Sequence, residues 1–268
     1  MALAKLGDQS SVPDLIVLLA ALNESGGRLR SEEIQAAYLV QALGLLKAPQ
    51  AFRTMAAASL AWYSPVSGVK VQARKMMPLL TADYEKSLLQ LLTDDPDLEL
   101  REGLFQVVLD QNDSAASARA ASAVLAGAIT IQTKDKAEQD RIGRLTLLAL
   151  LTAQKAAAPP AALLPSLKTL TSGIPNPEVL TQSVRLLGKI DDAGAVAQLT
   201  AMLYRYNAQQ KAGTNKPQDV LLIRELFQAL AATGKAAVRP PLEEAKFSNY
   251  TPAQVREAQA ALDKLPRD

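Results

Sequence analysis

The chain contains no cysteine and no histidine among its 268 residues. Without cysteine there can be no disulfide, no thiolate nucleophile and no thiolate-bound metal. Without histidine the chain lacks the side chain that most often serves as a general base and as a ligand for zinc, copper or non-haem iron. These two absences remove most catalytic machinery. We therefore expect a protein that is not an enzyme and that uses no cofactor and no metal.

Aromatic residues, net charge and long apolar runs are also scarce. Aromatic side chains make up 4% of the chain, whereas hydrophobic residues make up 49%, and most of these are Ala and Leu, as in closely packed helices. The net charge is only +2, so the composition demands neither a nucleic acid nor an anionic membrane as partner. No apolar run approaches the roughly 18 residues of a membrane span, and we expect no transmembrane segment.

The start of the chain has no signal-peptide pattern. Met1 leads directly into repeat-like sequence, without a basic region, an apolar stretch and a cleavage site. A leader that had been removed would leave the same start. The lack of cysteine and the polar turns are compatible with an exported, periplasmic bacterial protein, and a cytoplasmic adaptor would look similar, so the localisation stays open.

Apolar residues recur at the spacing of an α-helix along almost the whole chain, and the strict alternation of a strand is not found. The apolar face of one early helix comprises Leu15, Ile16, Leu19 and Leu22, that of the next begins with Ile34, Ala37, Tyr38 and Leu45, and that of its partner runs from Phe52 to Trp62. Later helices are expected in pairs at 67–80 with 82–93, 97–110 with 114–130, 135–154 with 160–171, 177–190 with 193–207 and 218–233 with 235–246, before a last helix at 252–264. The sequence predicts an all-α chain without β-sheet.

One motif occurs three times, at residues 2–16, 177–199 and 251–265. The middle copy reads Pro-Glu-Val at 177–179, Leu-Leu-Gly-Lys-Ile-Asp-Asp at 186–192 and Ala-Val-Ala-Gln-Leu at 195–199. The first copy matches the second half of this pattern, and the last copy matches the first half. Self-similarity over a few tens of residues is the signature of a repeat array.

The motif resembles the HEAT repeat, in particular the bacterial variant first noted in phycobilisome lyases. That variant reads approximately Pro-Glu-Val-Arg, then Ala-Leu-Gly-Lys-Leu-Gly-Asp, then Ala-Val-Pro-Ala-Leu. Residues 177–199 follow it without a gap and depart from it at Leu180, Asp191 and Ala197. The resemblance implies a right-handed α-solenoid, HEAT- or armadillo-like, of about seven antiparallel helix pairs in a single domain over residues 1–268. It also implies a scaffold or adaptor whose extended surface binds another protein.

The residues of the motif have physical roles that can be predicted. Gly188 should lie against a packed helix, where a side chain would hold the neighbouring helices apart. Asp8 and Asp192 should cap the second helices of their repeats. Val12 and Val196 should begin the buried stripes of those helices.

The outward face of the predicted second helices supplies the candidate partner-binding residues. These are Arg53, Thr54, Leu60, Gln198, Tyr204, Arg205 and Arg239. Tyr and Arg are frequent interface anchors because they combine a large buried area with directed hydrogen bonds. The alternative is that these positions are ordinary solvated ones. The polar insert at 207–217 is a second candidate, as a loop that contacts a partner.

The acidic, glycine-rich and basic segments of the chain do not indicate a metal site, a phosphate loop or a nucleic-acid site. The acidic groups at 94–97, 191–192 and 243–244 suit helix caps and exposed faces, and the glycine pairs lack the strand–loop–helix context of a phosphate loop. A basic ladder for nucleic acid is interrupted at Pro165 and Ala197, and Trp62 falls at a core position. We therefore expect no nucleic-acid partner.

Two alternatives to a protein-binding scaffold stay open. The resemblance to lyase-type repeats raises a bilin lyase-like chromophore chaperone, and some HEAT-like proteins bind nucleic acids. The ends of the chain cut through the motif, so we expect either a longer protein or end repeats that are covered by a partner or by another copy.

Overall fold

The computed structural model describes residues 7–25, 27–173 and 176–266. These residues contain fourteen α-helices, α2 to α15, and no strand. The prediction of an all-α chain is confirmed. Within the described residues, no helix combines the length and the apolar character that crossing a membrane requires. The first half of the first motif copy, residues 2–6, lies outside the described residues.

The chain divides into two compact units, unit 1 at Met1–Gln111 and unit 2 at Asn112–Asp268. We describe each unit by itself. That residues 1–268 form a single domain stays a prediction.

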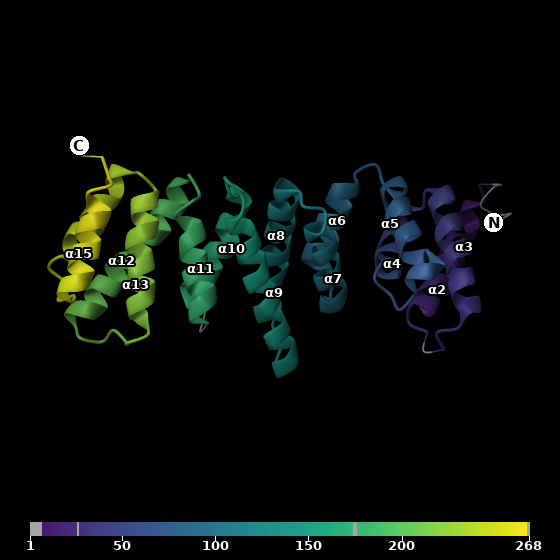
Figure 1. Ribbon diagram of the computed structural model, residues 1–268, viewed down its shortest axis with the longest axis horizontal. Helices are drawn as coiled ribbons and strands as arrows, with labels where there is room; N and C mark the ends of the chain where they lie inside the picture. The colour runs from purple at the N-terminus through teal and green to yellow at the C-terminus, as the bar shows by residue number, and fades with distance from the viewer. Residues whose placement is uncertain (1–6, 26, 174–175, 267–268) are drawn as a thin grey trace. The chain divides into compact units, whose positions relative to one another are not determined.

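The described part of unit 1 contains six α-helices (Figure 1, purple to blue). They are α2 (Val12–Asn23), α3 (Arg30–Leu46), α4 (Phe52–Ala58), α5 (Val69–Leu80), α6 (Tyr84–Asp94) and α7 (Leu98–Leu109), with 3₁₀ turns η1 (Gln9–Ser11), η2 (Pro49–Ala51) and η3 (Pro65–Ser67). Helix α2 packs on α3 and α4, α3 and α4 both pack on α5, and α7 contacts α4 and α6. Tyr63 and Phe105 are among the largest fully buried side chains of this core.

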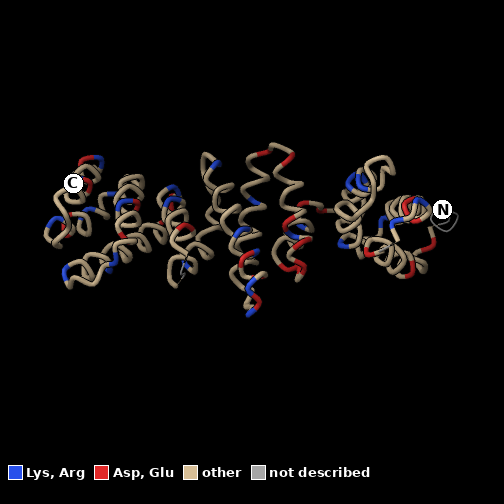
Figure 2. Tube along the Cα trace, turned by 60° about the horizontal axis from the view of Figure 1, so that its bottom comes forward, with Lys and Arg blue, Asp and Glu red and all other residues tan. Residues whose placement is uncertain are grey.

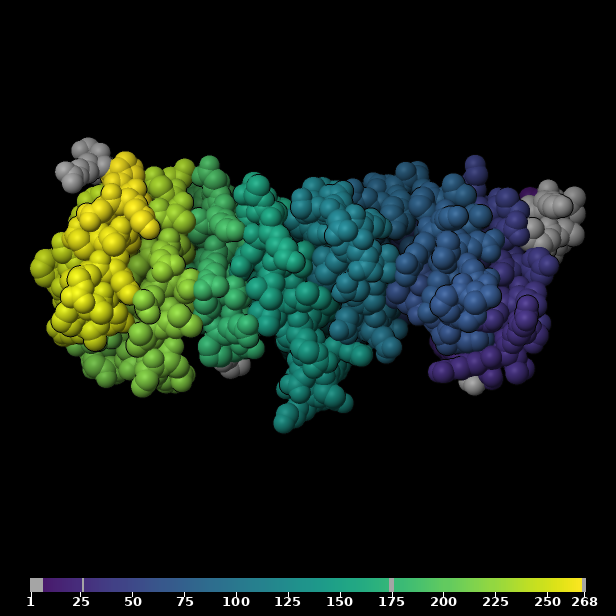
Figure 3. Space-filling view, in the orientation of Figure 1, coloured from purple at the N-terminus to yellow at the C-terminus, as the bar shows by residue number. Residues whose placement is uncertain are grey.

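In unit 2 the residues that the structure describes form eight α-helices in two rows (Figure 1, teal to yellow). They are α8 (Ser114–Ala128), α9 (Lys136–Gln154), α10 (Leu164–Gly173), α11 (Pro177–Leu187), α12 (Ala193–Lys211), α13 (Asp219–Ala232), α14 (Arg239–Ala245) and α15 (Pro252–Leu262), with 3₁₀ turns η4 (Ala161–Leu163) and η5 (Ala236–Val238). Helices α9, α11, α13 and α15 pack side by side in one row, and α8, α10, α12 and α14 form the other. Figure 3 shows that side chains fill the space between neighbouring helices of the unit.

Polar side chains begin the helices where the sequence predicts turns. The N-terminal residues whose side chains accept from backbone N–H groups of the first turn are Asp83, Asp97, Asp113, Asp135, Asn176, Asp192 and Thr251. Each such bond satisfies an N–H that has no partner inside the helix. The observed bounds differ most from the predicted ones at α10 and α14, where a 3₁₀ turn precedes the helix, and at α12, which continues to Lys211.

The motif residues lie largely as predicted. A Cβ atom at Gly188 would be 2.8 Å from the Cα atom and the carbonyl oxygen of Ala229 on α13, so only glycine fits there without displacement. Asp192 accepts a hydrogen bond from the Gly194 N–H at 2.6 Å and begins α12. Val12 is buried, but Val196 is only half-buried. The stripe of α12 starts one residue earlier, at Ala195.

Candidate functional site

Three of the seven predicted partner-binding residues line one groove of unit 1. This groove, here the α4 groove, has a volume of about 350 Å³ and lies between α2, α4 and the start of α7. Arg53, Thr54 and Leu60 line it together with the acidic residues Glu24 and Asp97.

All three residues make contacts within the fold. Arg53 donates two hydrogen bonds to Asp95, from Nε to Oδ2 at 2.7 Å and from Nη2 to Oδ1 at 3.1 Å. The Asp95 side chain is 2% exposed, and its hydrogen bond raises the pKa of Arg53. Thr54 is buried, with 9% exposure, which corrects its predicted outward position. Leu60 is half-buried against α7, where a Cβ atom at Gly103 would be 2.6 Å from its Cδ1.

The other four predicted residues lie in unit 2, and two of them hold helices together. Gln198 donates to Thr171 Oγ1 on α10 at 2.9 Å. Arg239 donates to the carbonyl oxygens of Leu262 and Pro266, both at 3.3 Å, and so binds the end of α15. Both residues are half-buried.

Tyr204 and Arg205 on α12 are exposed, as predicted. The Arg205 guanidinium lies 5.2 Å from the ring centroid of Tyr206. The seven predicted residues therefore do not form one site; Arg53, Tyr204 and Arg205 are exposed, and Arg53 is already bound to Asp95.

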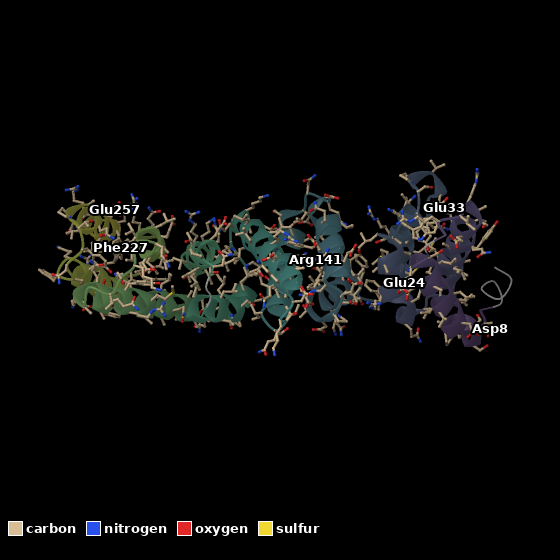
Figure 4. All side chains as sticks on the ribbon, turned by 90° about the horizontal axis from the view of Figure 1, so that it is seen from below. Asp8, Glu24, Glu33, Arg141, Phe227 and Glu257 are labelled. Carbon is tan, nitrogen blue, oxygen red and sulfur yellow. The ribbon has the colours of Figure 1, made fainter. Side chains whose placement is uncertain are left out.

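A larger groove, which the sequence did not reveal, lies beside the start of α3. We call it the α3 groove, and it has a volume of about 770 Å³. One wall comes from α3 and the turn before it, with Arg28, Arg30, Glu33, Ile34, Ala37 and Tyr38, and the other from the segment after α4, with Trp62, Ser64, Val66 and Ser67. Figure 4 shows Glu33 on the opposite side of unit 1 from Asp8.

Apolar side chains of the α3 groove are unusually exposed. Ile34 is 51%, Tyr38 56% and Val66 96% exposed. The apolar face predicted from Ile34 and Tyr38 is therefore wrong. The buried residues of α3 are instead Ala36, Val40, Ala42, Leu43, Gly44 and Leu46. The helix has two apolar faces, and the groove exposes the second.

Trp62 also departs from its predicted core position. Its side chain is half-buried and lines the α3 groove, while its indole N–H donates to the Leu22 carbonyl oxygen at 2.9 Å. The hydrogen bond holds the ring at the wall of the groove with its polar edge already satisfied.

Two glutamates fix the walls of the α3 groove. Glu32 accepts from the Leu29 N–H at 2.8 Å and from Ser25 Oγ at 2.7 Å, which closes the turn before α3. Glu33 accepts from the Ser64 N–H at 2.6 Å and joins the two walls. The hydrogen bonds from Ser25 and Ser64 lower the pKa of Glu32 and Glu33 respectively, so both carboxylates are ionised at neutral pH.

The arginines of the α3 groove have no such partners. Arg28 and Arg30 are exposed, and the ion pairs of the described residues all lie elsewhere. Arg30 contributes only a longer-range attraction to Glu33. The groove thus combines exposed apolar and aromatic side chains with two cations that are available to a ligand.

A third groove, in unit 2, includes part of the predicted polar insert. This α11 groove, of about 590 Å³, lies between α11, Tyr206 and the start of α13, and Lys216 from the insert lines it. The insert makes hydrogen bonds within unit 2. Its first part continues α12, and Asn215 Nδ2 donates to Gln210 Oε1 at 2.8 Å. Arg185, one of the two cations that line this groove, is bound by Glu225.

The described residues contain no cluster of acidic side chains suited to a metal ion. In Figure 2 acidic and basic residues are interspersed, and no stripe of Lys and Arg runs along either unit within its described residues. Comparisons with protein-family models, curated proteins and solved structures found no match for this chain. The function must therefore be argued from the grooves.

Proposed function

We propose that this chain is a non-enzymatic protein–protein interaction scaffold of HEAT-like repeats, and that it binds a segment of a partner protein in the α3 groove. The observation that carries this proposal is the exposure of Ile34, Tyr38 and Val66 beside Arg28 and Arg30. Contiguous exposed apolar surface with a charged rim is typical of interaction sites. Tyr, Trp and Arg are also the residues that most often dominate binding energy.

The repeat architecture is supported by unit 2 and by the motif. Two rows of packed helices, the close contact of Gly188 with Ala229 and the cap at Asp192 are what a stacked helical repeat requires. A right-handed α-solenoid of about seven pairs is the form of this architecture that we propose. Such arrays commonly present grooves along a row of helices.

The size of the α3 groove suits a short segment. Completing the burial of a half-exposed aliphatic or aromatic side chain contributes on the order of 1 kcal/mol. The ordering of the partner segment opposes this gain. We therefore expect reversible binding of a few anchoring side chains, with Tyr204 and Arg205 available for a second contact elsewhere.

Selection from a random linear peptide library, with the whole chain as target, tests the proposal. We expect enriched peptides to bind the wild type and to lose about tenfold or more in affinity on Ile34→Asp, which puts a charge into the groove. Val220→Asp on α13 is the matched control, because Val220 is also exposed and lies in unit 2. Enriched peptides that bind Ile34→Asp as well as the wild type would contradict the proposal, as would the absence of any enrichment.

A bilin-binding chaperone is the second candidate. Arg28 and Arg30 could pair with the two propionates of a linear tetrapyrrole, while Tyr38 and Trp62 offer flat apolar surfaces. Titration with biliverdin distinguishes the two functions. A saturable shift of its visible absorbance that Arg28→Ala/Arg30→Ala abolishes would favour the chaperone, and an unchanged spectrum would remove it.

A further inference from the structure

We infer that the segment bound in the α3 groove is acidic, with a carboxylate next to an apolar anchor side chain. The inference rests on the proposed function and adds the chemical class of the partner. It is carried by the placement of two exposed arginines, Arg28 and Arg30, beside an exposed apolar groove.

The backbone fixes where the two arginines stand. Arg28 adopts φ 54°, a left-handed conformation that a non-glycine residue rarely takes. The turn is closed by the bonds of Glu32 to the Leu29 N–H and to Ser25 Oγ. Arg28 and Arg30 therefore both start from an ordered turn at the rim of the groove.

The carboxylates nearby are ionised, but among the described residues neither forms an ion pair with these arginines. Glu32 is held by Ser25 and Leu29, and Glu33 by the Ser64 N–H. The remaining polar lining, Ser64 and Ser67, is uncharged. A ligand carboxylate would gain charge-assisted hydrogen bonds from a guanidinium, which binds a carboxylate with two parallel bonds.

A second copy of this chain is a poorer occupant. A two-fold contact brings the same patch of both copies together, and the Glu33 carboxylate, which would have to pair with an arginine of the other copy, is already held by the Ser64 N–H. Arg28 and Arg30 gain more from a partner carboxylate that has no such bond.

A nucleic acid is also a poorer occupant. Binding along a phosphate backbone needs a succession of cations, whereas this groove has two and its other lining is mostly apolar. A protein segment supplies both the carboxylate and the apolar anchor.

The test uses peptides selected from the random library on the wild-type chain. We expect the selected peptides to be enriched in Asp or Glu beside an apolar residue. Their affinity should fall about tenfold or more on Arg28→Glu/Arg30→Glu, which equals about 1.4 kcal/mol. Replacement of the peptide's acidic residues by Lys should restore binding to this variant. The matched control is Lys134→Glu/Lys136→Glu, the same charge change at exposed positions of unit 2.

The outcomes separate this inference from the proposed function. Peptides that lose affinity on Ile34→Asp, but are neither acidic nor sensitive to Arg28→Glu/Arg30→Glu, would overturn the inference and leave the function standing. The absence of any peptide sensitive to Ile34→Asp would overturn both.

A dimer in sedimentation that Ile34→Asp dissociates would assign the groove to a second copy and overturn the acidic partner. Binding of single-stranded DNA that requires Arg28 and Arg30 would assign the groove to a nucleic acid and would likewise overturn the acidic partner. Far-ultraviolet circular dichroism verifies the fold of each variant, and Arg28→Ala/Arg30→Ala provides a milder change, for which loss of peptide affinity is likewise expected.

Discussion

Arg185 on α11 donates two hydrogen bonds to Glu225 on α13, from Nη2 to Oε1 at 2.5 Å and from Nε to Oε2 at 2.8 Å. The Glu225 side chain is only 9% exposed, whereas Arg185 extends from it into solvent. The pair joins neighbouring helices of one row of unit 2. The carboxylate depends on this partner more than the guanidinium does, because burial removes its hydration.

We predict that Arg185→Ala destabilises unit 2 by about 2 kcal/mol, since it leaves the Glu225 carboxylate uncompensated. Chemical denaturation followed by circular dichroism measures this loss. Lys235→Ala is the control, because it breaks the exposed pair with Asp191 at 2.8 Å. We expect little change from the control. Equal effects of the two substitutions would contradict the structural role given to Arg185.

Gly188→Ala should destabilise unit 2 by about 2 kcal/mol. The new methyl group would meet the Ala229 backbone at 2.8 Å, so α11 and α13 must move apart. Gly143→Ala is the matched control in α9, where a Cβ atom has no neighbour within 4 Å. It should stabilise its helix by about 1 kcal/mol. Thermal unfolding of the two variants should therefore shift in opposite directions, and a shared direction would show that the contact at Gly188 is not limiting.

The motif allowed the packing of α11 and α12 to be predicted in some detail. Gly188 makes a close contact with Ala229, and Asp192 caps α12. The residue types and their spacing in the motif are enough to indicate both roles. The start of the α12 stripe was predicted one residue late, at Val196 instead of Ala195. Burial of Ala195 depends on the angle at which α12 packs, which local sequence does not give.

The α3 groove could not be predicted in the same way. It joins residues 28–38 to residues 62–67, and their proximity depends on the bond from the Ser64 N–H to Glu33 and on the packing of α3 against α5. One signal was present. Ile34 and Tyr38 lie on a different side of the helical wheel from Ala36 and Val40. An apolar helix face that competes with a second one indicates that one of them stays exposed.

The partner-binding residues predicted from the outward face also depend on contacts between distant segments, which the local sequence does not show. Arg53, Gln198 and Arg239 carry polar groups that suit an interface, but each bonds to a residue elsewhere in its own unit, respectively Asp95 after α6, Thr171 on α10 and Leu262 on α15. Sequence register places a residue on a side of a helix. It does not show whether a neighbouring helix already uses that side.

The cap at Asp113 should make stability depend on pH. Hydrogen bonds from the Ala116 and Ala115 N–H groups lower the pKa of Asp113. Because the folded pKa is below that of the unfolded chain, the stabilisation is present at neutral pH and is lost as the pH falls from about 4 through the folded value. The difference in Tm between wild type and Asp113→Ala should therefore be large at pH 7 and shrink in acid. Asp113→Asn, a neutral cap, should show much less dependence, and a constant Asp113→Ala difference would contradict this role.

The most direct test of the α3 groove uses Trp62, which is the only tryptophan of the chain and lines that groove. A peptide selected on the wild type should shift Trp62 emission to shorter wavelength as it excludes water, and the shift should saturate at the affinity found by calorimetry. Ile34→Asp should abolish the shift, and Val220→Asp should keep it. A peptide that binds in the calorimeter and leaves Trp62 emission unchanged would contradict the assignment of the α3 groove as the partner site.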